Sequence, residues 1–351
     1  MQVYAQTYTD DSNPFVSGSA PGSCQYPQIT VGGLLDGFSH GRDIWALYGP
    51  EKLGLLPPTP NRDKVWLRSS SSPLTQDTAG AVLRGIWPEY TLPVALHQQQ
   101  SSVDTVNEGF SCPAQSQVLD AIKASDSWND HLSATKPLRD SLATMFDASS
   151  DSWMSTFDHF CDNFQARLCN GYRLPCSRRN QSQCVTQSQA DEVFRAGDWE
   201  WNYYWRTNAN VTQYIQLVEG LFIKEIVNRL QTVASGRSDL VFSLTFIHDG
   251  DLGPILGALG ISRLRWPGMG SNISFELWYG DHVPVFLRKR GPRLTAVMSR
   301  KTSDGSHYAR VLYSGHPVKS VHGTLDWISL STLIDILTPF IPNDIVSMCQ
   351  Q

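Results

Sequence analysis

The stretch LVFSLTFIHDGD, residues 240–251, decides the fold class of this chain. Leu240–Phe246 is an apolar run, which predicts a buried strand. It leads directly into a helix, for which Asp251 is a suitable cap residue and Pro254 a suitable residue of the first turn. A strand joined to a helix in this way is typical of a parallel α/β sheet, in which ligands bind at the carboxyl ends of the strands.

His248 and Asp249 are the ionisable pair at the end of this strand. The free N–H groups at the start of the next helix favour an anion. A His and an Asp suit phosphate chemistry there, because one can hold the anion while the other protonates a leaving oxygen. The alternative interpretation is that His248 only satisfies a buried polar contact, which a short motif of this kind also allows.

Other segments carry motifs of a known family. Gln28–Tyr48 (QITVGGLLDGFSHGRDIWALY) is similar to LT..G......G..L...Y, and Val65–Trp87 (VWLRSSSSPLTQDTAGAVLRGIW) to R(S/A)...R...SA..F..G. Ile273–Trp278 followed by Tyr308–Ser314 resembles FELW...VRVLYNG. With the His-Asp pair, these segments resemble the histidine acid phosphatases, a family that includes fungal acid phosphatases and phytases. The resemblance covers most of residues 28–349. It implies an α/β fold, with a sheet and flanking helices plus a largely helical inserted lobe.

The resemblance also implies roles for individual residues. In the family, a nucleophilic His forms a phosphohistidine intermediate, which divides the hydrolysis of a phosphate monoester into two steps. By resemblance, His248 would bind the phosphoryl oxygens and Asp249 would protonate the leaving group. Arg68, at the end of its expected strand, is a candidate substrate-binding residue. We expect Arg68 and His248 to open onto one cleft under the helical lobe.

The chain departs from the family pattern at two places. The nucleophile motif R-H-G-x-R-x-P does not occur in it, and the nearest string, Ser39–Asp43 (SHGRD), lies inside an expected helix. His40 is therefore interpreted as a helix residue. Because the nucleophile motif is absent, these 351 residues alone should show negligible turnover of a phosphate ester. Leu74 stands where the family has its middle, phosphate-binding Arg. An apolar side chain cannot offset phosphate charge. This leaves open a non-catalytic or truncated relative that keeps the pocket and binds a phosphorylated ligand.

The order of the expected elements predicts a split domain. Residues 1–94 and 236–351 are interpreted as the α/β phosphatase-like domain, and residues 95–235 as the helical insertion lobe. In that lobe, apolar residues recur from Ile215 to Leu230 at steps of three and four, which predicts a helix with one side facing the core.

The seven cysteines favour disulfide bonds over a metal site. Four of them lie within residues 161–184, without the short spacings that zinc sites usually show and without an intervening His. The family resemblance implies a bridge between Cys112 and Cys349. At least one further bridge is expected among the four, and Cys24 is the expected unpaired thiol. The disulfide candidates are Cys112, Cys349, Cys161, Cys169, Cys176 and Cys184.

The remaining features indicate a secreted protein. Asn180, Asn210 and Asn272 begin glycan acceptor sequons, which agree with the cysteines on an oxidising compartment. Residues 1–27 have no signal-peptide pattern, so we expect that the signal peptide and the R-H-G segment are missing from this chain. The net charge is −5, and no Lys/Arg tract is long enough to follow a nucleic acid. The expected partner is a small phosphate monoester or phosphate, with no cofactor, no metal and no membrane span. The sequence does not indicate the oligomeric state.

Overall fold

The computed structural model describes residues 29–106, 109–177, 179–280, 282–286, 297–301 and 307–350. These residues form two compact units. The first contains the described residues up to Gln99 together with Val241–Phe246, and the second contains Gln100–Leu240 and the described residues from Ile247 onward. Cys24 lies outside the described residues. The predicted domain boundaries near residues 95 and 235 remain a prediction.

The first unit is built on a pair of parallel strands. β1 (Val65–Ser69) pairs in parallel with β2 (Phe242–Phe246), so that the first residues of the two strands lie opposite each other. The strand that carries Arg68 and the strand that precedes His248 therefore belong to one sheet, as the sequence predicts. Leu67 and Phe246 are buried in the core of this unit.

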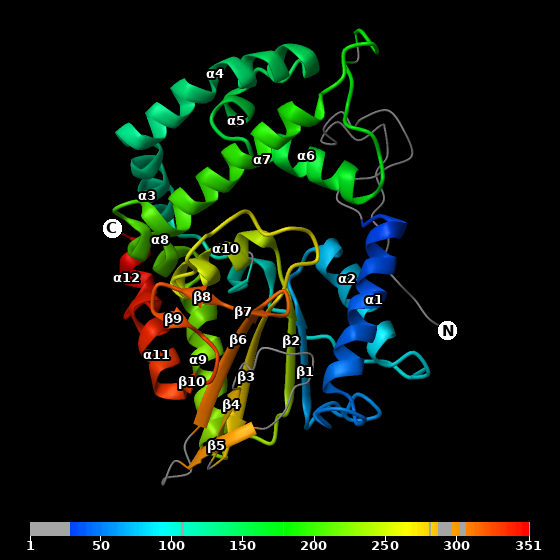
Figure 1. Ribbon diagram of the computed structural model, residues 1–351. Coiled ribbons are helices and arrows are strands. Elements are labelled where there is room, and N and C mark those ends of the chain that lie inside the picture. Colours follow the sequence, from blue (N-terminus) through cyan, green and yellow to red (C-terminus); the bar gives the residue numbers. More distant parts are fainter. Residues whose placement is uncertain are drawn as a thin grey trace. The chain divides into compact units, whose positions relative to one another are not determined.

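Two helices accompany this strand pair in the first unit, α1 (Val31–Tyr48) and α2 (Pro73–Ile86). Figure 1 shows the two helices side by side. They touch at two glycines. A Cβ atom on Gly41 would overlap the carbonyl oxygen of Val82, and one on Gly85 would overlap the carbonyl oxygen of Phe38. This backbone contact requires glycine at both positions. The helix expected around Ser39–Asp43 is confirmed as α1.

The second unit begins with a series of helices. In chain order they are η1 (Ser101–Val103), α3 (Pro113–Lys123), α4 (Asp126–Phe146), α5 (Asp151–Met154), α6 (Asp158–Cys169), α7 (Gln187–Asn202), η2 (Tyr203–Thr207), α8 (Val211–Val218) and α9 (Gly220–Ala234). Figure 1 shows α4–α7 as a group in green. Their shared core contains Phe157, Phe160 and Phe164, all almost completely buried.

The later part of the second unit is an antiparallel sheet with further helices. Its central sheet has the order β10-β6-β3. The short strand β7 pairs with the last two residues of β6, beyond the part that pairs with β10. The elements are α10 (Asp249–Ala258), β3 (Ile273–Tyr279), β4 (His282–Phe286), β5 (Val297–Lys301), β6 (His307–Tyr313), β7 (His316–Pro317), β8 (Lys319–Ser320), β9 (Gly323–Thr324), β10 (Ile328–Ser329), α11 (Leu330–Leu337), η3 (Thr338–Phe340) and α12 (Ile345–Cys349). A second core joins α8, α9, α10, β6 and α11 through Ile215, Ile223, Leu256, Val311 and Leu333. The α/β class predicted from the sequence is confirmed.

Candidate functional site

His248 and Asp249 lie at the start of α10, directly after the short link from β2. The backbone of His248 is extended, and its N–H donates a hydrogen bond to Asp251 Oδ2 at 2.7 Å. The Asp251 side chain is only 2% exposed. Its carboxylate therefore fixes the start of the helix, which leaves Asp249 as the accessible acid of this stretch.

The structure corrects the expected position of Pro254. This residue lies inside α10, as the sixth residue of the helix, and not in its first turn. Proline has no N–H, so the carbonyl of Gly250 loses its usual helical donor. The sequence suggested a later helix start because Asp251 is itself a good cap residue. In the structure His248 is the cap, and Asp251 binds back to it from the third helical position.

The Asp249 carboxyl is held at both of its oxygens. Oδ2 accepts a hydrogen bond from Trp266 Nε1 at 2.6 Å, and Oδ1 accepts one from the backbone N–H of Gly250 at 2.9 Å. The side chains of His248 and Asp249 are both half-buried. A fixed and partly accessible carboxyl can transfer a proton, while the positive end of the helix dipole attracts an anion.

Trp266 is itself fixed by α7. Its backbone N–H donates to Asp198 Oδ1 at 3.0 Å, and its ring packs against the ring of Trp201 with centroids 4.9 Å apart. Burial raises the pKa of Asp198, while the Trp266 N–H and the Arg265 charge act in the opposite direction. The helix that carries Asp198 and Trp201 therefore positions the indole that holds Asp249.

A second carboxyl, that of Asp162 on α6, is close enough to Asp249 to feel its charge. Burial raises the pKa of Asp162 to about 6, and the charges of Asp249 and Asp158 add to this effect, while His159 opposes it. Asp162 is nevertheless exposed to solvent, so the surrounding protein atoms act on its carboxyl without covering the residue. When both are ionised, Asp162 and Asp249 repel each other.

Arg68 belongs to the first unit, where it lies on β1 opposite Thr245 of β2. Its side chain is 4% exposed, and Nη2 donates to Gln99 Oε1 at 2.8 Å. The neighbouring Trp66 ring stacks on His97, with centroids 3.8 Å apart. The register places Arg68 at the carboxyl end of its strand, as the sequence predicts. Its role as a phosphate ligand remains a prediction.

His40, in the string nearest to the absent nucleophile motif, and Leu74 both lie on helices. His40 is within α1, as expected, and Leu74 is within the first turn of α2. Both side chains are half-buried. Leu74 therefore places an apolar side chain at the position of the family's middle Arg.

The structure forms two of the expected disulfide bonds. Cys112 is bonded to Cys349, with Cα atoms 4.5 Å apart, and Cys176 is bonded to Cys184. Both the implied bridge and the expectation of at least one bridge within residues 161–184 are therefore confirmed. The other two disulfide candidates are free thiols in the described structure, Cys161 buried and Cys169 exposed. Burial raises the pKa of Cys161, so its thiol is not a reactive one.

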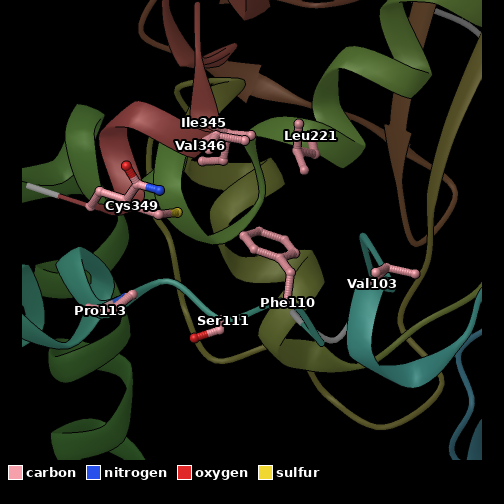
Figure 2. A pocket seen from close by; sticks show the side chains of 9 residues that line it. Val103, Phe110, Ser111, Pro113, Leu221, Ile345, Val346 and Cys349 are labelled. Atoms are coloured by element: carbon pink, nitrogen blue, oxygen red, sulfur yellow. The ribbon is translucent and has the colours of Figure 1, made fainter.

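A pocket of about 310 Å³ lies next to the Cys112–Cys349 bond. Figure 2 shows Phe110, Leu221 of α9 and Ile345 of α12 among the apolar side chains around it. The pocket is lined by Val103, Phe110, Ser111, Pro113, Leu221, Ile345, Val346, Cys349 and Gln350. This lining contains no ionisable group, so the pocket does not suit a phosphate ester.

The three sequon asparagines differ in their exposure. Asn180 is exposed, and Asn210 and Asn272 are half-buried. Within the described ranges, no group of three or more His, Cys, Asp or Glu side chains could hold a metal ion. No helix among the described residues is both long and apolar enough to cross a membrane.

Sequence reasoning missed Trp266, Asp162 and Asp198. Trp266 is 17 residues from Asp249, and Asp162 and Asp198 are still further away, so no motif joins them. The one available signal was the Trp-Pro pair at Trp266, which marks an aromatic ring at a fixed turn.

An α/β fold with an ionisable pair at a helix start, directly after a parallel strand, is typical of a protein that binds a ligand at the carboxyl end of a sheet. The comparison with protein families identifies the class more closely. Residues 7–314 match the histidine phosphatase superfamily (branch 2), and the chain belongs to this family. The predicted family is therefore confirmed.

Among curated proteins, the chain is similar to 2-phosphoxylose phosphatase 1 of Mus musculus. The two are 25% identical over 304 residues, which cover 84% of this chain and 56% of the relative. The protein of the same name from Homo sapiens is 22% identical over 296 residues, which cover 83% of this chain and 55% of the relative. The chain thus spans about half the length of the curated relatives it matches.

Among solved structures, the chain is similar to two bacterial phytases. The phytase of Klebsiella sp ASR1 has a TM-score of 0.61 at 16% identity, covering 93% of this chain and 90% of the phytase. The phytase of Citrobacter braakii has a TM-score of 0.60 at 12% identity, covering 95% of this chain and 92% of the phytase. At such identities the likeness shows a shared fold.

Proposed function

We propose that this chain forms the acid and phosphate-binding part of a phosphomonoesterase that works through a phosphohistidine intermediate. His248 binds the phosphoryl oxygens. Asp249 gives its proton to the ester oxygen as the phosphorus–oxygen bond breaks, and the alcohol leaves. The Asp249 carboxylate then takes a proton from the water that hydrolyses the phosphohistidine. Arg68 is the further candidate for substrate binding.

The observation that carries this proposal is the placement of Asp249. Its carboxyl is fixed by Trp266 at 2.6 Å, is partly open to solvent, and stands in the first turn of α10. The positive end of the α10 dipole favours a phosphate, and the acid beside it can reach the leaving oxygen. Asp251, the other acid of the stretch, is committed to the helix cap.

The proposal assigns the attack on phosphorus to a segment with the family's R-H-G-x-R-x-P motif, which the 351 residues do not contain. General acid catalysis is typically worth about 10²–10⁴-fold, far less than the hydrolysis of a phosphate monoester requires. The 351 residues alone should therefore bind phosphate without turning over an ester.

The substrate class and the compartment follow from further observations. The curated relatives are named 2-phosphoxylose phosphatase, which supports a sugar phosphate as substrate. No Lys-rich segment flanks Arg68 or His248, which favours a small ester over a polyanion. Two disulfide bonds and an exposed sequon at Asn180 support a secreted or lumenal, glycosylated protein.

Titration calorimetry with inorganic phosphate tests the binding half of this proposal on the 351-residue chain. His248→Ala should weaken binding about 10-fold to 100-fold, because it removes a hydrogen bond to a charged group. His40→Ala is the matched control and should leave the affinity unchanged. Phosphate binding that is insensitive to His248→Ala would contradict the assigned role.

Hydrolysis of 4-nitrophenyl phosphate at acidic pH tests the catalytic half. The 351-residue chain should be inactive, and the chain extended by an R-H-G-x-R-x-P segment should be active. An extended chain that binds phosphate but remains inactive would favour a non-catalytic phosphate-binding relative. Robust turnover by the 351 residues alone that depends on Asp249 would overturn the assignment of the nucleophile and make His40 the next residue to test.

A further inference from the structure

We infer that Trp266 is a positioning residue for the general acid: its indole N–H fixes Asp249 Oδ2 as an acceptor, so that the transferable proton is carried on Oδ1. This inference deepens the proposed function and rests on the role of Asp249 as the acid.

The geometry holds the indole firmly in place. Its Nε1 lies 2.6 Å from Asp249 Oδ2, its backbone N–H is bound to Asp198, and one ring face packs on Trp201. Gly197 of α7 completes the enclosure, since a Cβ atom there would lie only 3.1 Å from Trp266 Cε3. The indole N–H thus reaches Asp249 from a rigid support.

The chemistry of the two groups determines where the proton is carried. An indole N–H can only donate a hydrogen bond, so Oδ2 must accept from it in both protonation states of Asp249. Oδ1 also accepts from an N–H, that of the exposed residue Gly250, but at 2.9 Å instead of 2.6 Å. The more weakly bound oxygen is the better site for the proton, so the neutral acid carries it on Oδ1. The space that a side chain would occupy at Gly250 is open, with no atom within 4 Å of a Cβ placed there. Oδ1 is thus the oxygen that an incoming ester can approach.

The same hydrogen bond acts during the reaction. As the proton passes from Oδ1 to the ester oxygen, the phosphorus–oxygen bond breaks and the phosphoryl group passes to the imidazole nucleophile of the family motif. Negative charge then develops on the Asp249 carboxyl, and the indole N–H on Oδ2 stabilises it. Asp162, a neighbouring carboxyl, opposes this charge when it is ionised. The contribution of Trp266 should be greatest for a leaving group that needs a proton.

The hydrogen bond is tested first without any turnover, by ¹⁵N-indole NMR of the 351-residue chain. Trp266→Phe identifies the Trp266 resonance by its loss. Asp249→Ala should move this resonance upfield, because the indole loses a charged acceptor. Glu276→Ala is the matched control: Trp278 Nε1 donates to Glu276 Oε2 at 3.2 Å, so the Trp278 resonance should move and that of Trp266 should not. A Trp266 resonance that ignores Asp249→Ala would overturn the inference.

The positioning role is tested by kinetics of the protein that carries the R-H-G-x-R-x-P segment. Trp266→Phe should lower kcat/KM, which covers the steps up to departure of the alcohol, about 10-fold to 100-fold on glycerol 2-phosphate, an alkyl ester. It should lower kcat/KM on 4-nitrophenyl phosphate much less, because nitrophenolate leaves without a proton. Trp201→Phe replaces the indole that packs on Trp266 by a smaller ring but leaves the Trp266 N–H in place. This control variant should affect both substrates equally.

The two levels of failure are distinguishable. Equal losses of kcat/KM on both substrates with Trp266→Phe would mean that Trp266 has only a structural role. If the protein with the motif hydrolyses neither ester, the proposed function fails, while the NMR result still decides whether Trp266 fixes Asp249.

Discussion

The disulfide bond between Cys112 and Cys349 should stabilise the chain more than the bond between Cys176 and Cys184. The first bond joins residues 237 positions apart and the second joins residues 8 positions apart. In the chain-entropy description a bond stabilises by restricting the unfolded chain, with a term that grows as 1.5RT times the logarithm of the loop length. The difference between the two loops is about 3 kcal/mol.

The assay is urea unfolding of two variants, each with one pair of cysteines changed to alanine. Both bonds lie in the second compact unit, so the same unfolding transition reports on both. The Cys112→Ala/Cys349→Ala variant should lose about 3 kcal/mol more of its unfolding free energy than the Cys176→Ala/Cys184→Ala variant. Cys169→Ala, which removes an exposed free thiol, is the control and should change little. Equal losses, or a larger loss for the short loop, would refute the loop-length argument.

Two further predictions concern the surroundings of Asp249. Folding raises the pKa of Asp162 from 3.8 to about 6. Between these two pH values the folded chain keeps a proton on Asp162 that the unfolded chain has released. This contribution to stability is lost as the pH rises through that interval. The Tm of Asp162→Asn should therefore equal that of the wild type at pH 3.5 and exceed it at pH 7. An unchanged Tm at pH 7 would contradict this. Gly253→Ala should cost about 1–3 kcal/mol, because the new methyl group would overlap the Trp201 ring. Gly250→Ala has open space and should be nearly neutral in chemical unfolding, and a similar cost for both would show that α10 is not packed as described.

The elements of the first unit could be predicted because their signals are local. Ser72 and Pro73 mark the start of a helix, and the apolar run that ends at Phe246 marks a strand. The same local reasoning placed the start of α10 too late, since His248 and Asp251 are both able to cap a helix. Only the hydrogen bond from the His248 N–H to Asp251 shows which of them is the cap.

The support of the acid could not be predicted from such signals. Trp266 reaches Asp249 from a loop, and Asp198 and Trp201 of α7 hold that tryptophan in place. A single sequence does not encode that contact in any periodic pattern. The Cys112–Cys349 bond, also between distant residues, was anticipated only through the resemblance to a family.

In the proposed function Asp249 is the general acid of a phosphomonoesterase. The most direct test is the rate of hydrolysis of glycerol 2-phosphate at acidic pH by the protein with the R-H-G-x-R-x-P segment, compared with its Asp249→Asn variant. We expect the variant to lose about 10²–10⁴-fold in kcat, because an amide cannot supply the proton that an alkoxide leaving group needs. Its affinity for inorganic phosphate should remain close to that of the wild type. A variant that retains a kcat close to that of the wild type on this ester would contradict the claim.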